Sequence, residues 1–214
     1  MKIDTHIHTK GISGCSKLTN EELVEEYKKN GYDCLFVTNH LSSKNYRRNE
    51  LQRITNGYKD LKKLGDKNGL KIFFGIELRH ERNDYLIYGL SPDLVEKNNL
   101  AEMSFIDLKI FCEKYNAVII QAHPFREKNG KFSYETNINA HGVEVLNGHP
   151  ANNQHNDKSL EYAIINKKLK TAGSDSHKIS GTCRVAMIYD GDIISESHFV
   201  QLLKWGKFRL EKYF

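Results

Sequence analysis

The apolar positions of the chain fall into two kinds of segment that alternate from end to end. Short apolar runs are typical of buried strands, and the longer segments between them repeat apolar residues at helical spacing. The predicted strands span residues 1–8, 34–40, 72–78, 85–89, 117–121, 142–146, 169–172 and 184–189. The predicted helices span residues 19–30, 45–68, 104–115, 153–167 and 195–205. This alternation indicates an α/β fold whose parallel sheet is rolled into, or close to, a barrel.

Local signals mark the ends of some of these helices. Thr19 and Glu22 stand three positions apart, as in a capping box, and Gly31 follows the helix that they begin. Gly57 could interrupt the long helix predicted over residues 45–68.

One connection is too short for a parallel barrel. The strands at 72–78 and 85–89 are joined only by residues 79–84, whereas a parallel crossover needs about a dozen residues. These two strands should therefore form a hairpin, and the predicted architecture is a distorted TIM-like barrel. No repeat, low-complexity tract or linker divides the chain, so we expect residues 1–214 to form a single domain.

Composition and charge narrow the function classes. The 214 residues are 39% hydrophobic and 28% charged, as in an ordinary globular protein. No apolar run reaches the roughly 18 residues of a membrane helix, and the N-terminus lacks a signal-peptide pattern, so we expect a cytoplasmic protein without membrane contact. The net charge of +5 fits either solvated helix faces or a patch that attracts phosphate, and no nucleic-acid-binding motif is present.

Histidines and acids gather at the ends of the predicted strands. In a barrel the carboxyl ends of the strands converge on one face. A lone histidine there is usually structural, but five histidines and two acids from five strands favour a metal site. The residues are His6, His8, His40, Glu77, His123, Asp175 and His177.

The mixture of imidazole and carboxylate suits hydrolytic ions of the zinc, manganese or iron type. Seven ligands are too many for one ion, so we expect two or three, with Glu77 as a bridge between a pair. The predicted hairpin also brings Asp84 towards Glu77, either as a further ligand or only as a turn residue. Four cysteines without a CxxC pair read as reduced thiols rather than a structural zinc site.

Five short motifs in order resemble those of the PHP (polymerase and histidinol phosphatase) family. They are Asp4-Thr5-His6-Ile7-His8, Thr38-Asn39-His40, Gly75-Ile76-Glu77, Ala122-His123-Pro124 and Gly173-Ser174-Asp175-Ser176-His177. The resemblance implies a distorted seven-stranded β/α barrel, a centre of two or three metal ions and phosphoesterase activity, and it supports ligand roles for the seven residues named above. The sequence departs from the family pattern twice: Asp84 stands where the family usually has His, and Cys15 where it often has Asp or His.

The predicted function is a metal-dependent phosphoesterase that hydrolyses a phosphate ester with a metal-activated water. Glu77 and Asp175 are the expected catalytic residues, and Arg126 and Arg184 are candidates for binding phosphate, although either arginine could be an exposed ion-pairing residue. The substrate could be a phosphorylated small molecule, a nucleotide or the end of a nucleic acid, and no obligate protein partner is expected. The alternatives are a metal-dependent amidohydrolase and a metal-binding regulatory domain that has lost turnover.

Overall fold

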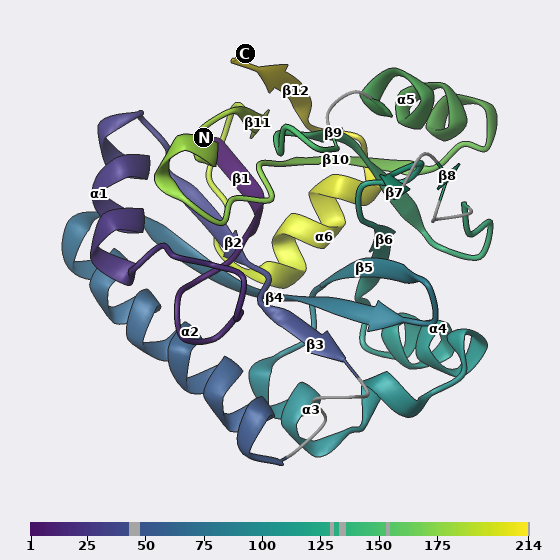
Figure 1. The fold of residues 1–214 in the computed structure, drawn as a ribbon, viewed down its shortest axis with the longest axis horizontal. Helices are drawn as coiled ribbons and strands as arrows, with labels where there is room; N and C mark the ends of the chain where they lie inside the picture. Colours follow the sequence, from purple (N-terminus) through teal and green to yellow (C-terminus); the bar gives the residue numbers. More distant parts are fainter. Residues whose placement is uncertain (43–47, 129–130, 133–135, 153–154, 214) are drawn as a thin grey trace.

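A mixed sheet that nearly closes into a barrel forms the centre of the protein (Figure 1). The computed structural model describes residues 1–42, 48–128, 131–132, 136–152 and 155–213. The strand order is β10-β9-β6-β5-β4-β2-β1-β11-β12, with β3 beside β4. The strands are β1 (Lys2–Ile7), β2 (Cys34–Val37), β3 (His40–Ser42), β4 (Lys71–His80), β5 (Asn83–Tyr88), β6 (Val118–Gln121), β9 (Gly142–Asn147), β10 (Leu169–Gly173), β11 (Val185–Ile188) and β12 (Arg209–Lys212), with a small separate hairpin of β7 (Glu127–Lys128) and β8 (Lys131–Phe132). The expected distorted TIM-like barrel is confirmed.

The predicted hairpin is present and explains the distortion. β5 runs antiparallel to β4, with Glu77 opposite Leu86 and Arg79 opposite Asp84. β5 is also antiparallel to β6, and β11 is antiparallel to β1, so the sheet is only partly parallel.

The barrel closes between β1 and β10 near the carboxyl ends of these strands. The Asp175 amide donates to the His6 carbonyl at 2.8 Å, and the Ser174 amide donates to the Asp4 carboxylate at 2.9 Å. The Thr5 hydroxyl donates to the Ala172 carbonyl at 3.0 Å. A few bonds to the end of β10 and to the loop after it, in place of a regular strand ladder, therefore close the sheet here.

Helices pack around the outside of the barrel, and one helix covers one of its ends. They are α1 (Asn20–Lys29), α2 (Arg48–Asn68), α3 (Pro92–Lys97), α4 (Phe105–Lys114), α5 (Asn156–Ile165) and α6 (Glu196–Lys204), with short 3-10 turns η2 (Leu100–Glu102) and η4 (Ile179–Gly181). Thr19 and Glu22 form the predicted capping box of α1. α2 runs through Gly57 without a break, and residues 45–47 of its predicted span lie outside the described residues.

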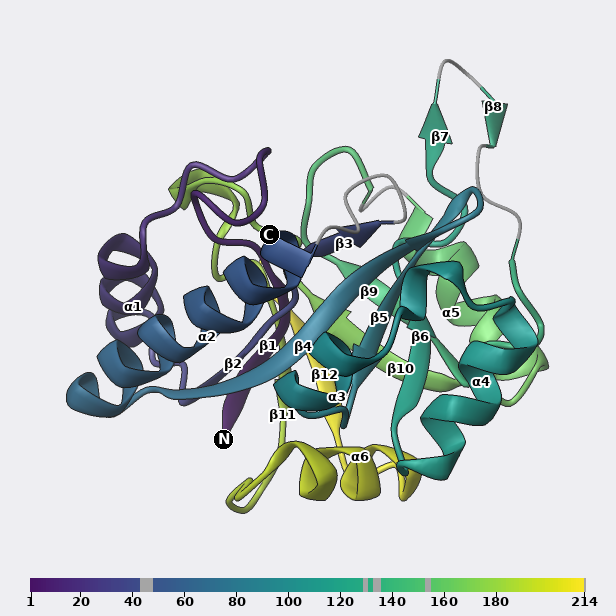
Figure 2. The same cartoon turned by 90° about the horizontal axis from the view of Figure 1, so that it is seen from below.

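α6 fills the end of the barrel opposite the carboxyl ends of the strands. Figure 2 shows α6 across that end, far from the β7–β8 hairpin. Phe199 and Val200 are fully buried there against Phe36 of β2 and Tyr88 of β5. Within the described residues, none of the helices combines the length and apolar character needed to cross a membrane.

Candidate metal centre

β1 supplies the first two histidines of the centre. Side chains two positions apart on a strand point to the same face, and His6 and His8 accordingly meet with their Nε2 atoms 3.2 Å apart. Both side chains are fully buried. Two imidazoles are thus held together with their nitrogens directed at one point.

Glu77 of β4 lies between two pairs of histidines. Its Oε1 is 3.5 Å from His6 Nε2 and 3.1 Å from His123 Nε2. Its Oε2 is 3.3 Å from His8 Nε2 and 2.7 Å from His40 Nδ1. A carboxylate with one oxygen towards each pair has the arrangement expected of a bridge between two ions.

A break in the second predicted strand places His40. The predicted strand over residues 34–40 is in fact β2 followed, after Thr38 and Asn39, by β3, and both pair with β4. His40 begins β3 directly opposite Glu77.

The loop after β10 completes the cluster. Asp175 Oδ1 lies 3.6 Å from His6 Nε2 and 3.3 Å from His8 Nε2. The His177 ring lies beside that of His8, tilted by 32°, with ring centroids 4.4 Å apart. Three sets of side chains have ligand atoms within 4.8 Å of one another: His8 with His40 and His177, His6 with His8 and Glu77, and Glu77 with Asp84 and His123.

The charges of the cluster favour added cations. Burial opposes ionisation of Glu77, but the neighbouring His40 and His6 hold the pKa of its carboxyl well below the usual range. Burial also opposes ionisation of Asp175, but the neighbouring His6 and His8 lower the pKa of its carboxyl. Burial would lower the pKa of His40, yet Glu77 raises it to about 11, whereas burial lowers the pKa of His8 to about 3. Ionised carboxylates at this depth require positive charge, which a divalent ion supplies more fully than a proton.

One buried atom gives a direct test of whether metal ions fit. Glu77 Oε2 is buried and has no donor in hydrogen-bond geometry, although His40 Nδ1 is only 2.7 Å away. A carboxylate oxygen buried without a hydrogen bond is costly. A cation beside it removes that cost, so the residues fit the implied metal ions.

A cavity of about 380 Å³ opens onto the cluster. Its lining residues are Cys15, His40, Glu77, His123, Arg126, His149, Asn152, Asp175 and His177. The structure thus places Arg126 at the site, whereas Arg184 is not among the lining residues. The role of Arg184 in binding phosphate stays a prediction.

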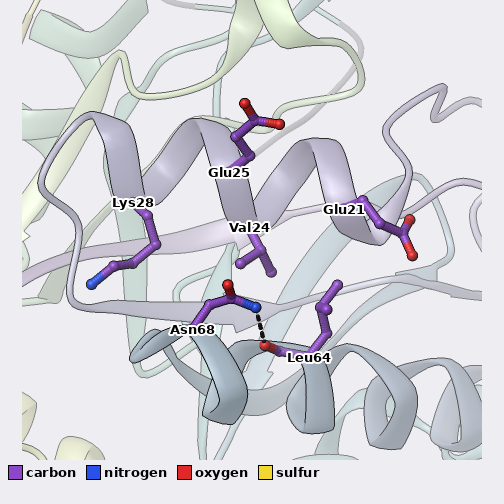
Figure 3. A pocket seen from close by; sticks show the side chains of 6 residues that line it. All are labelled: Glu21, Val24, Glu25, Lys28, Leu64 and Asn68. Atoms are coloured by element: carbon purple, nitrogen blue, oxygen red, sulfur yellow. Dashed lines mark hydrogen bonds between the residues drawn. The ribbon is translucent and has the colours of Figure 1, made fainter.

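A second hollow of about 540 Å³ lies between α1 and α2 (Figure 3). It is lined by Glu21, Val24, Glu25, Lys28, Leu64 and Asn68. These side chains include neither histidine nor cysteine. The smaller cavity, where the ligand-type side chains meet, is therefore the candidate site.

Comparison with known proteins finds relatives of the same fold. A family model described as PHP-associated matches residues 153–208. A two-domain protein from Bacteroides vulgatus, which contains a predicted PHP-like metal-dependent phosphoesterase, has a TM-score of 0.74 at 16% identity, covering 100% of this chain and 65% of that one. A candidate metal-dependent phosphoesterase from Bifidobacterium adolescentis has a TM-score of 0.59 at 15% identity, covering 94% of this chain and 95% of that one.

The resemblance to the PHP family is confirmed. An amidohydrolase from Chromobacterium violaceum is also similar, with a TM-score of 0.55 at 13% identity, covering 83% of this chain and 88% of that one. No curated protein sequence matches the chain. Because this chain spans only 65% of the Bacteroides protein, the expectation of a single domain stays a prediction.

Asp84 is one of two departures from the PHP pattern. The hairpin brings it into one ligand set with Glu77 and His123, as predicted, and its Oδ2 is 3.8 Å from His123 Nε2. Arg79 was not predicted to contact Asp84, yet its Nη1 donates to both Asp84 oxygens at 2.7 and 2.8 Å. Asp84 is thus buried between an arginine and the cluster.

Replacing Asp84 tests whether it belongs to the candidate metal centre or only to this ion pair. If it is a ligand, Asp84→Ala should lower the metal stoichiometry measured by elemental analysis, and Asp84→His should largely restore it, because imidazole also binds these ions. The control is Arg79→Ala, which removes the ion pair but keeps the carboxylate. Unchanged stoichiometry and turnover in Asp84→Ala would show that Asp84 serves only the hairpin.

Glu144 of β9 was not predicted, although it contacts two residues of the centre. Its Oε1 is 2.9 Å from His6 Nδ1. Its Oε2 accepts from the His123 amide at 2.9 Å and from Asn147 Nδ2 at 2.8 Å. Glu144 therefore orients His6 and fixes the turn of His123, whose φ of 27° is rare for a residue with a side chain.

Proposed function

We propose that the protein is a metal-dependent phosphoesterase that hydrolyses a small phosphate ester at the mouth of this cavity. The observation that carries the proposal is the position of Glu77, with one oxygen towards His6 and His123 and the other towards His8 and His40. Two or three divalent ions of the zinc, manganese or iron type, held by the clustered side chains, would supply Lewis acidity and a water that ionises near neutral pH.

The ligand roles extend this proposal residue by residue. The side chains proposed to hold the ions are His6, His8, His40, Glu77, Asp84, His123, Asp175 and His177. Among them Glu77 would supply negative charge to both halves of the centre, through one oxygen towards His6 and His123 and the other towards His8 and His40. Asp175 is held for its role by Asn152, whose Nδ2 donates to Asp175 Oδ2 at 2.9 Å and so turns Oδ1 towards His6 and His8.

Arg126 is the residue of the chain proposed to bind the phosphoryl group. It lines the cavity together with His149 and Asn152. A guanidinium donates two parallel hydrogen bonds to phosphate oxygens and stabilises the charge that builds up on them during hydrolysis. The cavity of about 380 Å³ falls within the roughly 300–1,000 Å³ of small-molecule sites. This size favours a phosphorylated small molecule or a nucleotide over a long nucleic acid.

Metal removal should abolish turnover. We expect protein purified without chelator to contain more than one transition-metal equivalent by elemental analysis. Dialysis against a chelator should stop hydrolysis of phosphate mono- and diesters, and zinc, manganese or iron should restore it.

The outcomes of this experiment separate the alternatives. Less than half an equivalent of metal after reconstitution would contradict the centre itself. Full metal occupancy without turnover on any phosphate ester would favour a regulatory domain. Turnover of carboxamides or lactones instead of phosphate esters would favour the amidohydrolase, a class represented among the structural neighbours.

A further inference from the structure

Cys15 stands at the mouth of the cavity beside two histidines of the centre. It is exposed and lines the cavity together with His40 and His177. These two histidines form one ligand set with His8, whose ring centroid is 4.4 Å from each of theirs. This is the outermost part of the cluster, because the His40 side chain is 40% exposed.

The loop that carries Cys15 is attached to the backbone of both histidines. Ser13, two residues before Cys15, accepts from the His40 amide at 3.1 Å through its hydroxyl. Lys17, two residues after Cys15, donates its amide to the His177 carbonyl at 2.8 Å. The loop that carries Cys15 is therefore fixed on both sides of the cysteine to the segments that carry His40 and His177.

A second observation points to a cation at the same place. Glu77 Oε2, the buried oxygen without a hydrogen bond, is the one that faces His8 at 3.3 Å and His40 at 2.7 Å. An unsatisfied carboxylate oxygen and two imidazoles thus meet in the outer part of the cluster, at the cavity that Cys15 also lines. Carboxylate, imidazole and thiolate are all zinc ligands.

We propose that Cys15 is a ligand of the outer metal ion, with His40, His177 and Glu77, and that its sulfur makes this position selective for zinc over manganese. The inference rests on the proposed metal centre and adds a sulfur donor to it. A thiolate is a soft ligand that favours zinc and cobalt, whereas manganese prefers oxygen donors. Four donors from the protein also match the tetrahedral coordination that zinc commonly adopts.

Cobalt provides a direct readout of a sulfur ligand. Metal-free wild-type protein titrated with Co²⁺ should develop a thiolate-to-cobalt charge-transfer band in the near ultraviolet, and Cys15→Ser should abolish it. The matched control is Cys183→Ser, which removes the other partly exposed thiol, whose sulfur faces the Glu26 carbonyl, and this variant should keep the band. Cobalt-loaded wild-type protein without the band, or a band that survives in Cys15→Ser, would overturn the proposal.

Affinity and chemical protection give independent readouts. Cys15→Ser should weaken zinc binding by about 10-fold or more, measured by competition with a chromophoric chelator, because loss of a ligand costs at least as much as loss of a residue that orients one. Manganese affinity should change by less than about threefold. Equal losses for both ions would contradict the selectivity.

Alkylation provides a measurement that does not depend on a variant. In wild-type protein, bound zinc should protect Cys15 from alkylation by iodoacetamide, and mass spectrometry measures the labelled fraction. Equal labelling of Cys15 with and without zinc would count against the ligand role. None of these readouts requires turnover. A protein with the cobalt band but no phosphoesterase activity would refute the proposed function and leave the Cys15 ligand in place. A protein with phosphoesterase activity but no cobalt band would refute the Cys15 ligand and leave the proposed function in place.

Discussion

Glu77→Gln is expected to lower phosphoesterase turnover by about 100- to 1,000-fold while leaving the protein folded. The carboxylate directs one oxygen towards His6 and His123 and the other towards His8 and His40. Glutamine keeps the shape but replaces one oxygen with an amide nitrogen that repels a cation. Charge stabilisation by metal ions contributes several kcal/mol to a transition state, and each 1.36 kcal/mol is about tenfold in rate.

Three measurements together test this expectation. The kinetic constants give the loss of turnover, elemental analysis gives the number of ions, and thermal unfolding shows whether the fold persists. Glu113→Gln is the matched control, because it makes the same exchange at a half-exposed side chain on α4. Turnover near the wild-type value in Glu77→Gln would show that Glu77 is not the bridge.

Glu144→Gln is expected to weaken metal binding by about 10- to 100-fold, although we do not expect Glu144 itself to contact an ion. The carboxylate accepts from His6 on one oxygen and from the His123 amide on the other. With the Nδ1 proton of His6 held by Glu144, the lone pair of Nε2 faces Glu77 and Asp175. Glutamine has only one accepting oxygen, so its amide group must face one of these two donors and turn that ligand away.

A metal titration tests this role apart from catalysis. Metal affinity by chelator competition should fall in Glu144→Gln, and an excess of metal should recover much of the turnover, because the ligands themselves remain. A variant that is inactive even when fully loaded would point to a direct role in catalysis instead. Unchanged affinity would contradict the positioning role.

The sequence predicted most of the cluster because of the geometry of strands. His6 and His8 must share a face, and strand ends must converge in a barrel, whatever the exact pairing of the strands. The short connection before Asp84 predicted the hairpin for a similarly general reason, since no parallel crossover fits it. The structure brings all these side chains together, and their roles as ligands stay predictions.

The residues that were missed depend on register and on buried hydrogen bonds. Glu144 lies within the apolar run of β9 between Val143 and Val145, and its burial was the available signal, because an acid in such a strand needs partners. The pairing of Arg79 with Asp84 follows only from the register of the hairpin. Short elements such as α3 and β12 were missed because they hold too few residues to show a period.

The seam between β1 and β10 also determines when the centre can be assembled. The Asp4 carboxylate and the Ser174 amide that it binds are 170 positions apart in the chain, so β1 must wait until the residues after β10 have been synthesised. Contacts this distant slow folding, because a long loop must close before they form. A nascent chain with only the first strands made carries His6 and His8 without Asp175 and His177, and so would lack part of the proposed ligand set. Acquisition of metal should therefore be a late event, which follows closure of the barrel and then stabilises the closed state.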